Sequence, residues 1–113
     1  NLDAKRDWGH ARDYVKAMWL MLQQKKPDDY VVGTGKKHSV KDFAEKAFEY
    51  VGLNYKDHLE IDKKLMRPSE VDYLLADHSK ATKKLKWKSE TTFDQLVKEM
   101  VESDLELVTK NKF

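Results

Sequence analysis

Residues 39–52 read SVKDFAEKAFEYVG and carry the signals of one amphipathic helix. Ser39 is a favourable N-cap, Asp42 stands in the first turn, and Gly52 can end the helix in the left-handed conformation. Helical spacing places six apolar residues on one face: Val40, Phe43, Ala44, Ala47, Phe48 and Val51. The stretch therefore predicts a helix over residues 40–51 with both ends marked and one face buried.

Two longer segments, one on each side of this helix, have the same period. Residues 11–24 carry apolar side chains at i, i+3, i+4, i+7, i+8 and i+11, which predicts a helix with a wide buried stripe that ends before Pro27. Residues 93–108 repeat the pattern, and Thr92 with Gln95 forms a capping box in front of them. Helices therefore dominate the predicted secondary structure.

Shorter elements fill the connections between these helices. A short helix is expected over residues 78–85, starting on Asp77, and strands are expected over residues 30–32 and 55–61. The chain has no internal repeat and no flexible linker, so residues 1–113 predict a single domain. We expect the α/β class, in the form of a small, mainly helical domain with a few short strands.

The composition excludes several classes of protein. There is no cysteine, which removes disulfides, zinc–cysteine sites and thiol nucleophiles. A net charge of +2 is too balanced to predict a nucleic-acid partner, and no apolar run approaches the length of a membrane span. We expect a cytoplasmic protein. The chain begins at Asn1 among charged residues, without a signal peptide, and this start indicates a piece cut from a longer protein.

The glycine-containing stretch YVVGTGKKHSVKDF, residues 30–43, raises the question of a phosphate-binding loop. A dinucleotide fingerprint that starts at Gly33 needs a third glycine where His38 stands. A Walker loop built on Gly35 needs glycine in place of Tyr30 and a hydroxyl residue in place of Lys37. The spacing therefore predicts a connecting loop, and an anion site must lie elsewhere.

Common catalytic and nucleic-acid-binding patterns receive little support. There is no G-x-S-x-G and no H-E-x-x-H motif, the four histidines lack metal-ligand spacing, and none of the five tyrosines has a lysine four residues later. The run KATKKLKWK, Lys80 to Lys88, places Ala81 and Leu85 on one helix face and lysines on the others. This division is typical of a solvated helix, behind which Trp87 packs.

Arginine usage is more informative than the charge run. The chain has 19 lysines but only three arginines, at positions 6, 12 and 67, which indicates that geometry rather than charge alone selected them. A planar guanidinium can hold a diphosphate through two parallel hydrogen bonds. Arg6 stands in RDW just before the first helix, and Arg67 precedes Pro68, which stiffens the following turn.

Several longer stretches carry a resemblance to a known family. They are NLDAKRDWGHARDYVKAMWLMLQ, VVGTGKKHSVKDF, LEIDKKLMRPSEVDYLLADHSKATKKLKWK and TTFDQLVKEMVESDLELV. In order, they resemble the C-terminal, substrate-binding part of the GDP-mannose 4,6-dehydratases, which are extended short-chain dehydrogenases/reductases. The D-x-S-K-A-x-x-x-L-x-W box at residues 77–87 is shared with nucleotide-sugar epimerases and dehydratases in general. NLDAKRDWGHARDYV together with RPSEVD narrows the resemblance to the GDP-mannose enzymes.

The resemblance implies roles for individual residues. By it, Arg6 and Arg67 reach toward the diphosphate of the nucleotide sugar, and Glu70 accepts hydrogen bonds from nucleotide hydroxyls. Asn1 and Leu2 match a segment whose backbone runs beside the base. We assign Arg12 and Trp8 to structure.

The resemblance also implies what this chain does not do. The NADP-binding Rossmann domain and the Thr/Glu/Tyr/Lys catalytic set of the family are absent from these residues. In the parent lyase, NADP takes hydride from C4 of the mannose, water leaves across C5 and C6, and hydride returns to C6, on the route to GDP-fucose and other deoxyhexoses. We expect this chain alone to bind and orient GDP-mannose, to be inactive and to hold no cofactor. Without the Rossmann domain it is expected to expose an apolar face; the full enzyme is expected to be a homo-oligomer.

Two alternatives stay open at this point. The chain could belong to another nucleotide-sugar epimerase or reductase of the same fold. It could also be a non-catalytic nucleic-acid or interaction module that uses Lys80 to Lys88, although we expect no nucleic-acid or membrane partner.

Overall fold

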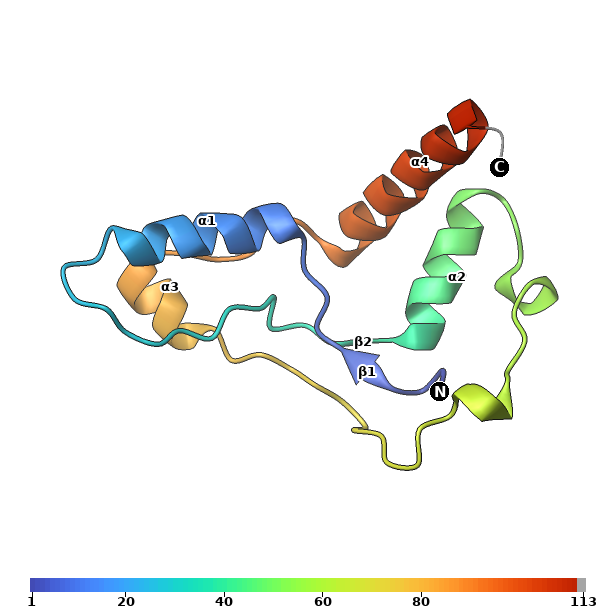
Figure 1. Ribbon diagram of the computed structural model, residues 1–113, viewed down its shortest axis with the longest axis horizontal. Coiled ribbons are helices and arrows are strands. Elements are labelled where there is room, and N and C mark those ends of the chain that lie inside the picture. The colour runs from blue at the N-terminus through green and yellow to red at the C-terminus, as the bar shows by residue number, and fades with distance from the viewer. Residues whose placement is uncertain (112–113) are drawn as a thin grey trace.

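The computed structural model describes residues 1–111 and is built from helices around a very small sheet. In chain order the elements are β1 (Lys5–Arg6), α1 (Ala11–Leu22), β2 (His38–Ser39), α2 (Val40–Tyr50), η1 (Tyr55–Asp57), η2 (Lys63–Leu65), α3 (Ser79–Leu85) and α4 (Phe93–Asn111). Helix α2 packs against α4, α1 packs against α3, and β1 lies between the two helix pairs (Figure 1).

The helix signals read from the sequence are confirmed for α2 and α4, whereas α3 begins at Ser79 with His78 as its N-cap and not on Asp77. Ser39 Oγ accepts from the Asp42 amide at 3.0 Å, and the Asp42 carboxylate accepts from the Ser39 amide at 2.9 Å, so α2 begins with a reciprocal capping box. Gly52 follows α2 with a φ of +76°, in the left-handed region. Thr92 and Gln95 cap α4 in the same reciprocal way, at 2.9 and 3.2 Å. Local sequence therefore determines where these helices start and stop.

Both predicted strands are wrong. Residues 30–32 form no strand, because their side chains serve as packing groups: Tyr30 and Val32 lie against the core between α1 and α3. Residues 55–61 begin with the 3₁₀ turn η1, which is stabilised by Asn54, whose side chain accepts from the Lys56 amide at 3.0 Å. A local cap and a tertiary contact thus override β-propensity in these two segments.

The actual sheet is centred on β1. On one side β2 pairs with it antiparallel, with Lys5 opposite Ser39 and Arg6 opposite His38. On the other side residues 72–74 run parallel to β1: the Lys5 amide donates to the Asp72 carbonyl at 2.9 Å, and the Leu74 amide donates to the Lys5 carbonyl at 3.0 Å. β1 therefore joins segments that are distant in sequence.

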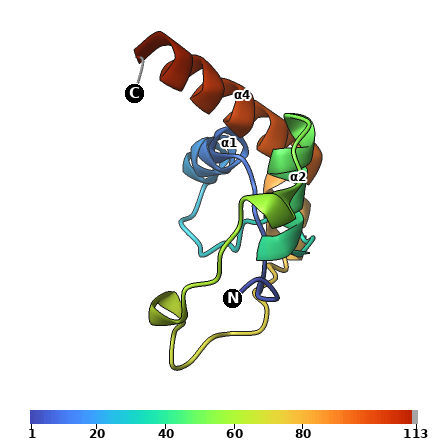
Figure 2. The ribbon, with the colours of Figure 1, turned by 90° about the vertical axis from the view of Figure 1, so that its right-hand side faces the viewer.

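Two small cores hold the helix pairs. The first lies between α1 and α3 and consists of four buried residues: Ala17, Ala81, Leu85 and Trp87. The second is aromatic and links the residue Trp8 after β1 with β2, α2 and α4. The ring centroids of Trp8 and Phe43 are 5.2 Å apart, and His38 stacks on Phe93 at 3.9 Å. Figure 2 shows α4 next to α2 near its N-terminal end and extending away from α2 toward its C-terminal end.

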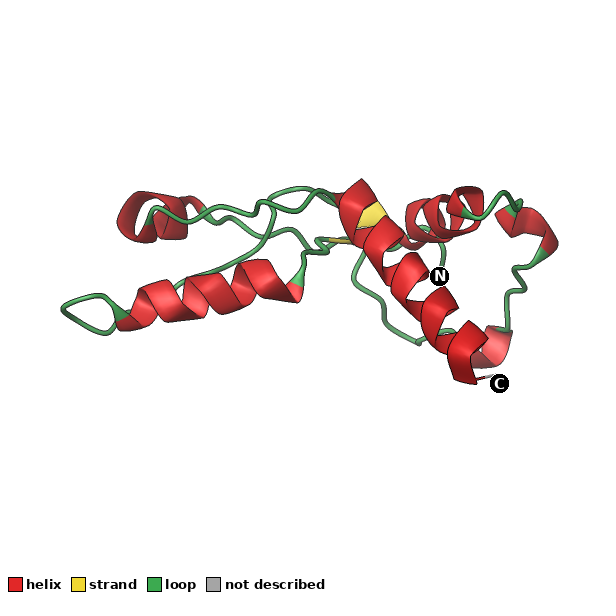
Figure 3. Ribbon diagram, turned by 90° about the horizontal axis from the view of Figure 1, so that it is seen from above, coloured by secondary structure: helices red, strands yellow, loops and turns green. Residues whose placement is uncertain are grey.

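The molecule is flat and open. It measures 52 × 38 × 20 Å and has a radius of gyration of 17.1 Å, whereas a compact domain of this length has about 13 Å. It exposes 8939 Å², roughly 2,500 Å² more than the about 6,450 Å² of a compact monomer of this mass. Figure 3 shows the thin profile, with the α1 and α3 pair at one end and α2 and α4 toward the other. Much surface that a closed domain would bury therefore lies open.

The predicted buried stripe of α1 is part of this open surface. Its members Val15, Met18, Trp19 and Leu22 are 60, 57, 61 and 82% exposed. The opposite side of α1, with Asp13 and Ala17, is the buried one. The helix is confirmed, but the prediction that this stripe is buried is wrong for residues 1–111, because nothing in them covers it. The expected exposed apolar face is therefore the stripe itself.

None of the helices in the described part of the chain is both long enough and apolar enough to cross a membrane.

Candidate functional site

Arg6 and Glu70 form the centre of the candidate site. β1 presents the Arg6 side chain to residues 70–71, and there Nη2 donates to Glu70 Oε1 at 2.5 Å while Nη1 donates to the Val71 carbonyl at 3.0 Å. Both side chains are about four-fifths buried, at 23 and 21% exposure. The structure therefore brings the RDW and RPSE segments together across 64 positions of sequence.

Glu70 keeps part of its acceptor capacity. Its Oε1 holds Arg6, and no donor among the described residues bonds to Oε2. An ionised carboxylate has about four lone-pair positions, so Glu70 can orient Arg6 and still accept from another group.

Arg67 lies in the loop three residues before Glu70 and is exposed. Three extended residues span at most about 11 Å, so the two Cα atoms lie within that distance. Within residues 1–111 no hydrogen bond or ion pair involves the Arg67 guanidinium. That Arg6 and Arg67 clasp one diphosphate stays a prediction.

Asn1 and Leu2 begin the segment that leads into β1 and Arg6. The Asn1 side-chain oxygen accepts from the Asp3 amide at 3.0 Å, and the Leu2 carbonyl accepts from the Lys41 amide at 3.0 Å. Asn1 also borders an open hollow together with Asp72 and Tyr73. The N-terminal residues thus lie beside the segment that carries Glu70, although their proposed contact with a base is not tested.

A second open hollow adjoins Arg6, between β1 and the segment that follows Glu70. Its lining residues are Arg6, Asp7, Trp8, Leu74, Leu75 and Ala76. The Arg6 cation lies there beside apolar side chains, so a ligand with an anionic part and an apolar part suits this surface.

Asp7 is the residue that sequence reasoning missed. Its Oδ1 accepts from the Thr34 amide at 3.0 Å and from the Thr34 hydroxyl at 2.5 Å, and its Oδ2 accepts from the amides of Gly35 and Ala76 at 2.9 and 3.2 Å. Burial raises the pKa of Asp7, but these hydrogen bonds outweigh burial and hold the pKa below its ordinary value. The carboxylate adjacent to Arg6 was the available signal, although its partners are far away in sequence.

The glycine-containing loop has a clear role in this arrangement. The amides of Thr34 and Gly35 point at an anion, as a phosphate-binding loop requires, but that anion is the protein's own Asp7. A Cβ on Gly33 would stand 2.2 Å from Ala76 Cβ, so only glycine permits this approach of the two loops. The loop is therefore a structural joint, as its spacing predicted.

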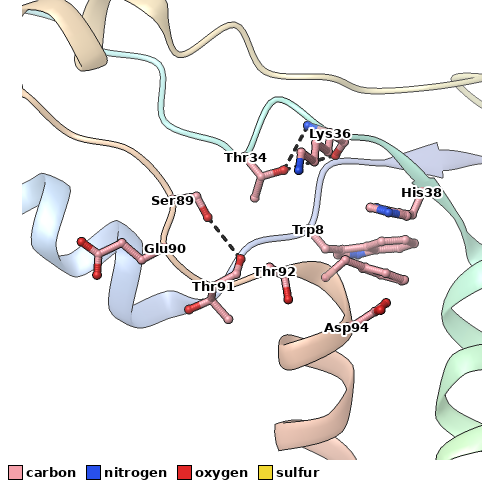
Figure 4. A pocket seen from close by; sticks show the side chains of 10 residues that line it. Trp8, Thr34, Lys36, His38, Ser89, Glu90, Thr91, Thr92 and Asp94 are labelled. Atoms are coloured by element: carbon pink, nitrogen blue, oxygen red, sulfur yellow. Dashed lines mark hydrogen bonds between the residues drawn. The ribbon is translucent and has the colours of Figure 1, made fainter.

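A separate cavity of about 260 Å³ lies where β1, the 34–38 loop and the start of α4 meet (Figure 4). Trp8 and His38 lie on one side of it, and Ser89 and Thr91 line another side. Nδ1 of His38 is buried and has no hydrogen-bond partner among the described residues. Arg6, Arg67 and Glu70 do not line this cavity, so it is distinct from the candidate site.

The residues assigned to structure make structural contacts. Arg12 pairs with Glu99 at 3.0 Å and donates to Thr91 Oγ1 at 3.2 Å, while Trp8 belongs to the aromatic core. Trp87 is 2% exposed behind α3, as expected for a packing residue. No group of histidine and acidic residues in the described chain could hold a metal ion.

Comparison with solved structures shows which known proteins share this fold. A UDP-glucose 4-epimerase from Bifidobacterium longum, in complex with NAD⁺ and UDP, matches 96% of this chain with a TM-score of 0.73 at 28% identity. A protein termed RMD from Pseudomonas aeruginosa, complexed with NADPH, matches 90% with a TM-score of 0.77 at 21% identity. The chain covers 31 and 33% of these structures. The fold is that of a part of an extended short-chain dehydrogenase/reductase.

Sequence comparison is more specific. The family model described as GDP-mannose 4,6 dehydratase matches residues 1–100. GDP-mannose 4,6 dehydratase 1 of Arabidopsis thaliana is 60% identical over 112 residues, which is 99% of this chain, and the human GDP-mannose 4,6 dehydratase is 48% identical over 128 aligned positions, or 98%. This chain belongs to the GDP-mannose 4,6-dehydratase family. It spans about a third of the length of these relatives, 31 and 34% respectively.

Proposed function

We propose that this chain is the C-terminal, substrate-binding part of a GDP-mannose 4,6-dehydratase and that it binds and orients GDP-mannose. The observation that carries the proposal is the Arg6–Glu70 pair, which unites two family segments on one side of β1. Arg6 and Arg67 supply two guanidinium forks for the diphosphate, and Glu70 both orients Arg6 and accepts from a nucleotide hydroxyl. The chain's contribution to catalysis is positioning.

The parent protein is proposed to be a cytoplasmic lyase that works as a homo-oligomer and uses NADP. That cofactor supplies the hydride exchange when bound, and we assign its binding, together with the catalytic acid and base groups, to a Rossmann domain outside residues 1–113. These 113 residues alone are then expected to hold the nucleotide sugar without transforming it.

The proposal is tested in the full-length enzyme that contains this chain. Arg6→Ala and Arg67→Ala are each expected to raise KM for GDP-mannose about 10- to 100-fold, because a charge-assisted hydrogen bond contributes roughly 1.5–3 kcal/mol. Arg6→Lys keeps the charge but loses the planar fork, and is expected to recover only part of the affinity. The measurement is initial-rate kinetics of the formation of the 4-dehydro-6-deoxy product.

Arg12→Ala provides the matched control, since Arg12 is also an arginine with an acidic partner but contacts Glu99 and Thr91. It should leave KM for GDP-mannose within about twofold. Absence of product from GDP-mannose, or equal KM values for Arg6→Ala and wild type, contradicts the proposal. Turnover of a UDP-sugar in preference to GDP-mannose indicates the related epimerase or reductase function.

The apolar face of α1, formed by Val15, Met18, Trp19 and Leu22, is proposed to contact the Rossmann domain. These residues follow the i, i+3, i+4, i+7 spacing and are all more than half exposed, which is the pattern of a helix that awaits a covering layer. The excess exposed area of the chain supports the same interpretation.

The isolated 113-residue chain is therefore expected to self-associate through this face. Sedimentation velocity over a range of concentrations should show species heavier than the monomer, and Met18→Lys should shift the distribution toward monomer. Leu65→Lys is the control, because Leu65 is 80% exposed at the end of η2, away from α1 in the sequence. A chain that stays monomeric at all concentrations, or that responds equally to both substitutions, contradicts this assignment.

A further inference from the structure

Asp7 joins three segments of the chain at one carboxylate. It follows Arg6 directly, and its oxygens take hydrogen bonds from Thr34 and Gly35 in one loop and from Ala76 in another segment. An ionised carboxylate has about four lone-pair positions, so these four donors saturate it. Asp7 has no acceptor capacity left for a ligand and acts only on the protein.

The segments that meet at Asp7 approach each other closely. A Cβ added to Gly33 would stand 2.2 Å from Ala76 Cβ and 3.0 Å from Asp7 Oδ2. The 33–35 loop and residue 76 therefore touch across the carboxylate, and any group larger than hydrogen at position 33 forces them apart. Loss of the carboxylate would leave three backbone amides to find other partners.

This joint determines where the residues of the candidate site stand. Residues 61–75 contain no helix or strand apart from η2, and residues 61–69 are exposed, so this segment has little packing of its own. It is held to β1 at three successive positions: by the Lys5 backbone, by the Arg6 side chain and by the Asp7 side chain. Of the three, Asp7 alone also binds the 33–35 loop.

We propose that Asp7 is a positioning residue of the nucleotide-sugar site. It fixes residues 70–76 against β1 so that Arg6 on one segment and Arg67 with Glu70 on the other face the same ligand. The inference rests on the proposed function. It adds Asp7, which touches neither the ligand nor the reacting atoms and which acts on the ligand through Arg6 and Glu70.

The test is the Asp7→Asn variant of the full-length enzyme. Asparagine keeps the size of the side chain but replaces one oxygen by an NH₂ group, which repels the amides that Asp7 now binds. KM for GDP-mannose is expected to rise about tenfold or more, since bonds to a charged group are lost, while kcat and KM for NADP stay within about threefold. This split distinguishes loss of substrate positioning from general loss of active enzyme.

Asp13→Asn is the matched control. Like the half-buried Asp7, the buried Asp13 holds a distant segment through its carboxylate, but it binds Ser89 and Thr91, and that segment carries none of the proposed site residues. It should leave KM for GDP-mannose within about twofold. A rise equal to that of Asp7→Asn shows that destabilisation alone explains the effect and overturns the inference.

A milder variant keeps the test decisive if Asp7→Asn does not fold. Thr34→Val removes the hydroxyl donor to Asp7, together with the bonds of that hydroxyl to the Lys36 backbone, and keeps the Thr34 backbone amide. It is expected to raise KM for GDP-mannose about three- to tenfold, as the loss of one hydrogen bond implies. An unchanged KM in Thr34→Val or in folded Asp7→Asn overturns the inference. If Arg6→Ala raises KM in the same assay while the Asp7 and Thr34 variants do not, the proposed function stands and the positioning role of Asp7 is wrong. If Arg6→Ala has no effect either, the proposed function and the positioning role of Asp7 are both wrong.

Discussion

Replacing Trp87 by alanine is expected to lower the free energy of unfolding of the 113-residue chain by about 3–5 kcal/mol. Trp87 is 2% exposed, lies in the core with Ala17, Ala81 and Leu85, and donates from Nε1 to the Asp13 carbonyl at 2.8 Å. The substitution removes a large buried side chain and leaves a cavity between α1 and α3. Urea unfolding followed by circular dichroism, at one protein concentration for all variants, measures the change.

Trp19→Ala is the control for this prediction, because Trp19 is 61% exposed on the apolar face of α1. Its cost should stay below about 1 kcal/mol. Trp87→Phe keeps most of the volume but loses the donor to Asp13, and is expected to cost about 1–3 kcal/mol. Equal costs for Trp87→Ala and Trp19→Ala contradict the view that the core between α1 and α3 holds this half of the molecule.

Replacing Asp13 by alanine is expected to cost about 2–3 kcal/mol at neutral pH. Asp13 is 5% exposed, and its Oδ2 accepts from the Thr91 amide at 3.0 Å and from the Ser89 hydroxyl at 3.3 Å. The carboxylate therefore ties α1 to the segment that leads into α4. Its loss leaves the buried Thr91 amide without a partner, which adds a desolvation cost to the lost hydrogen bonds.

The pH dependence of this effect has a definite sign. Burial raises the pKa of Asp13, but hydrogen bonds from Thr91, Ser89 and Glu90 outweigh burial and hold the pKa below its ordinary value of 3.8. A lowered pKa in the folded state means that the contribution of Asp13 to stability is complete above the unfolded value and is lost as pH falls through the folded value.

The difference in unfolding free energy between wild type and Asp13→Ala should therefore be constant from pH 7 to about pH 5 and shrink as the pH falls below about 4. Asp104→Asn, a substitution at an exposed position of α4, should show no such change. A difference that grows on acidification contradicts the assignment of an ionised, hydrogen-bonded Asp13.

The resemblance to the family distinguished ligand-binding arginines from structural ones, which residue patterns alone did not. The small number of arginines in the chain draws equal attention to Arg6, Arg12 and Arg67. Only the family motifs give Arg6 and Arg67 a binding role and leave Arg12 as a structural residue. The structure agrees with that separation for Arg12, which pairs with Glu99, and it brings Arg6 to Glu70. It also adds Asp7, the middle residue of RDW, to which the resemblance gave no role, because the importance of this carboxylate is visible only through its hydrogen-bond donors.

The sequence by itself determined the four α-helices, the caps of α2 and α4, the left-handed stop at Gly52 and the burial of Trp87. These features depend on residues within about one turn of each other or on the period of one face, so they can be read locally. Tertiary structure alone decided that β1 and β2 are strands, that residues 30–32 are not, and that the anion in the glycine-containing loop is Asp7.

The stripe on α1 illustrates the physical reason for this division. The spacing of four apolar side chains indicates that they share one face of the helix. Whether that face is buried depends on what packs against it, and no part of residues 1–111 packs against this one. The Arg6–Glu70 pair and the Asp7 joint likewise form between positions 64 and 69 residues apart. Such contacts exist only once the chain has folded around β1, so no local pattern encodes them.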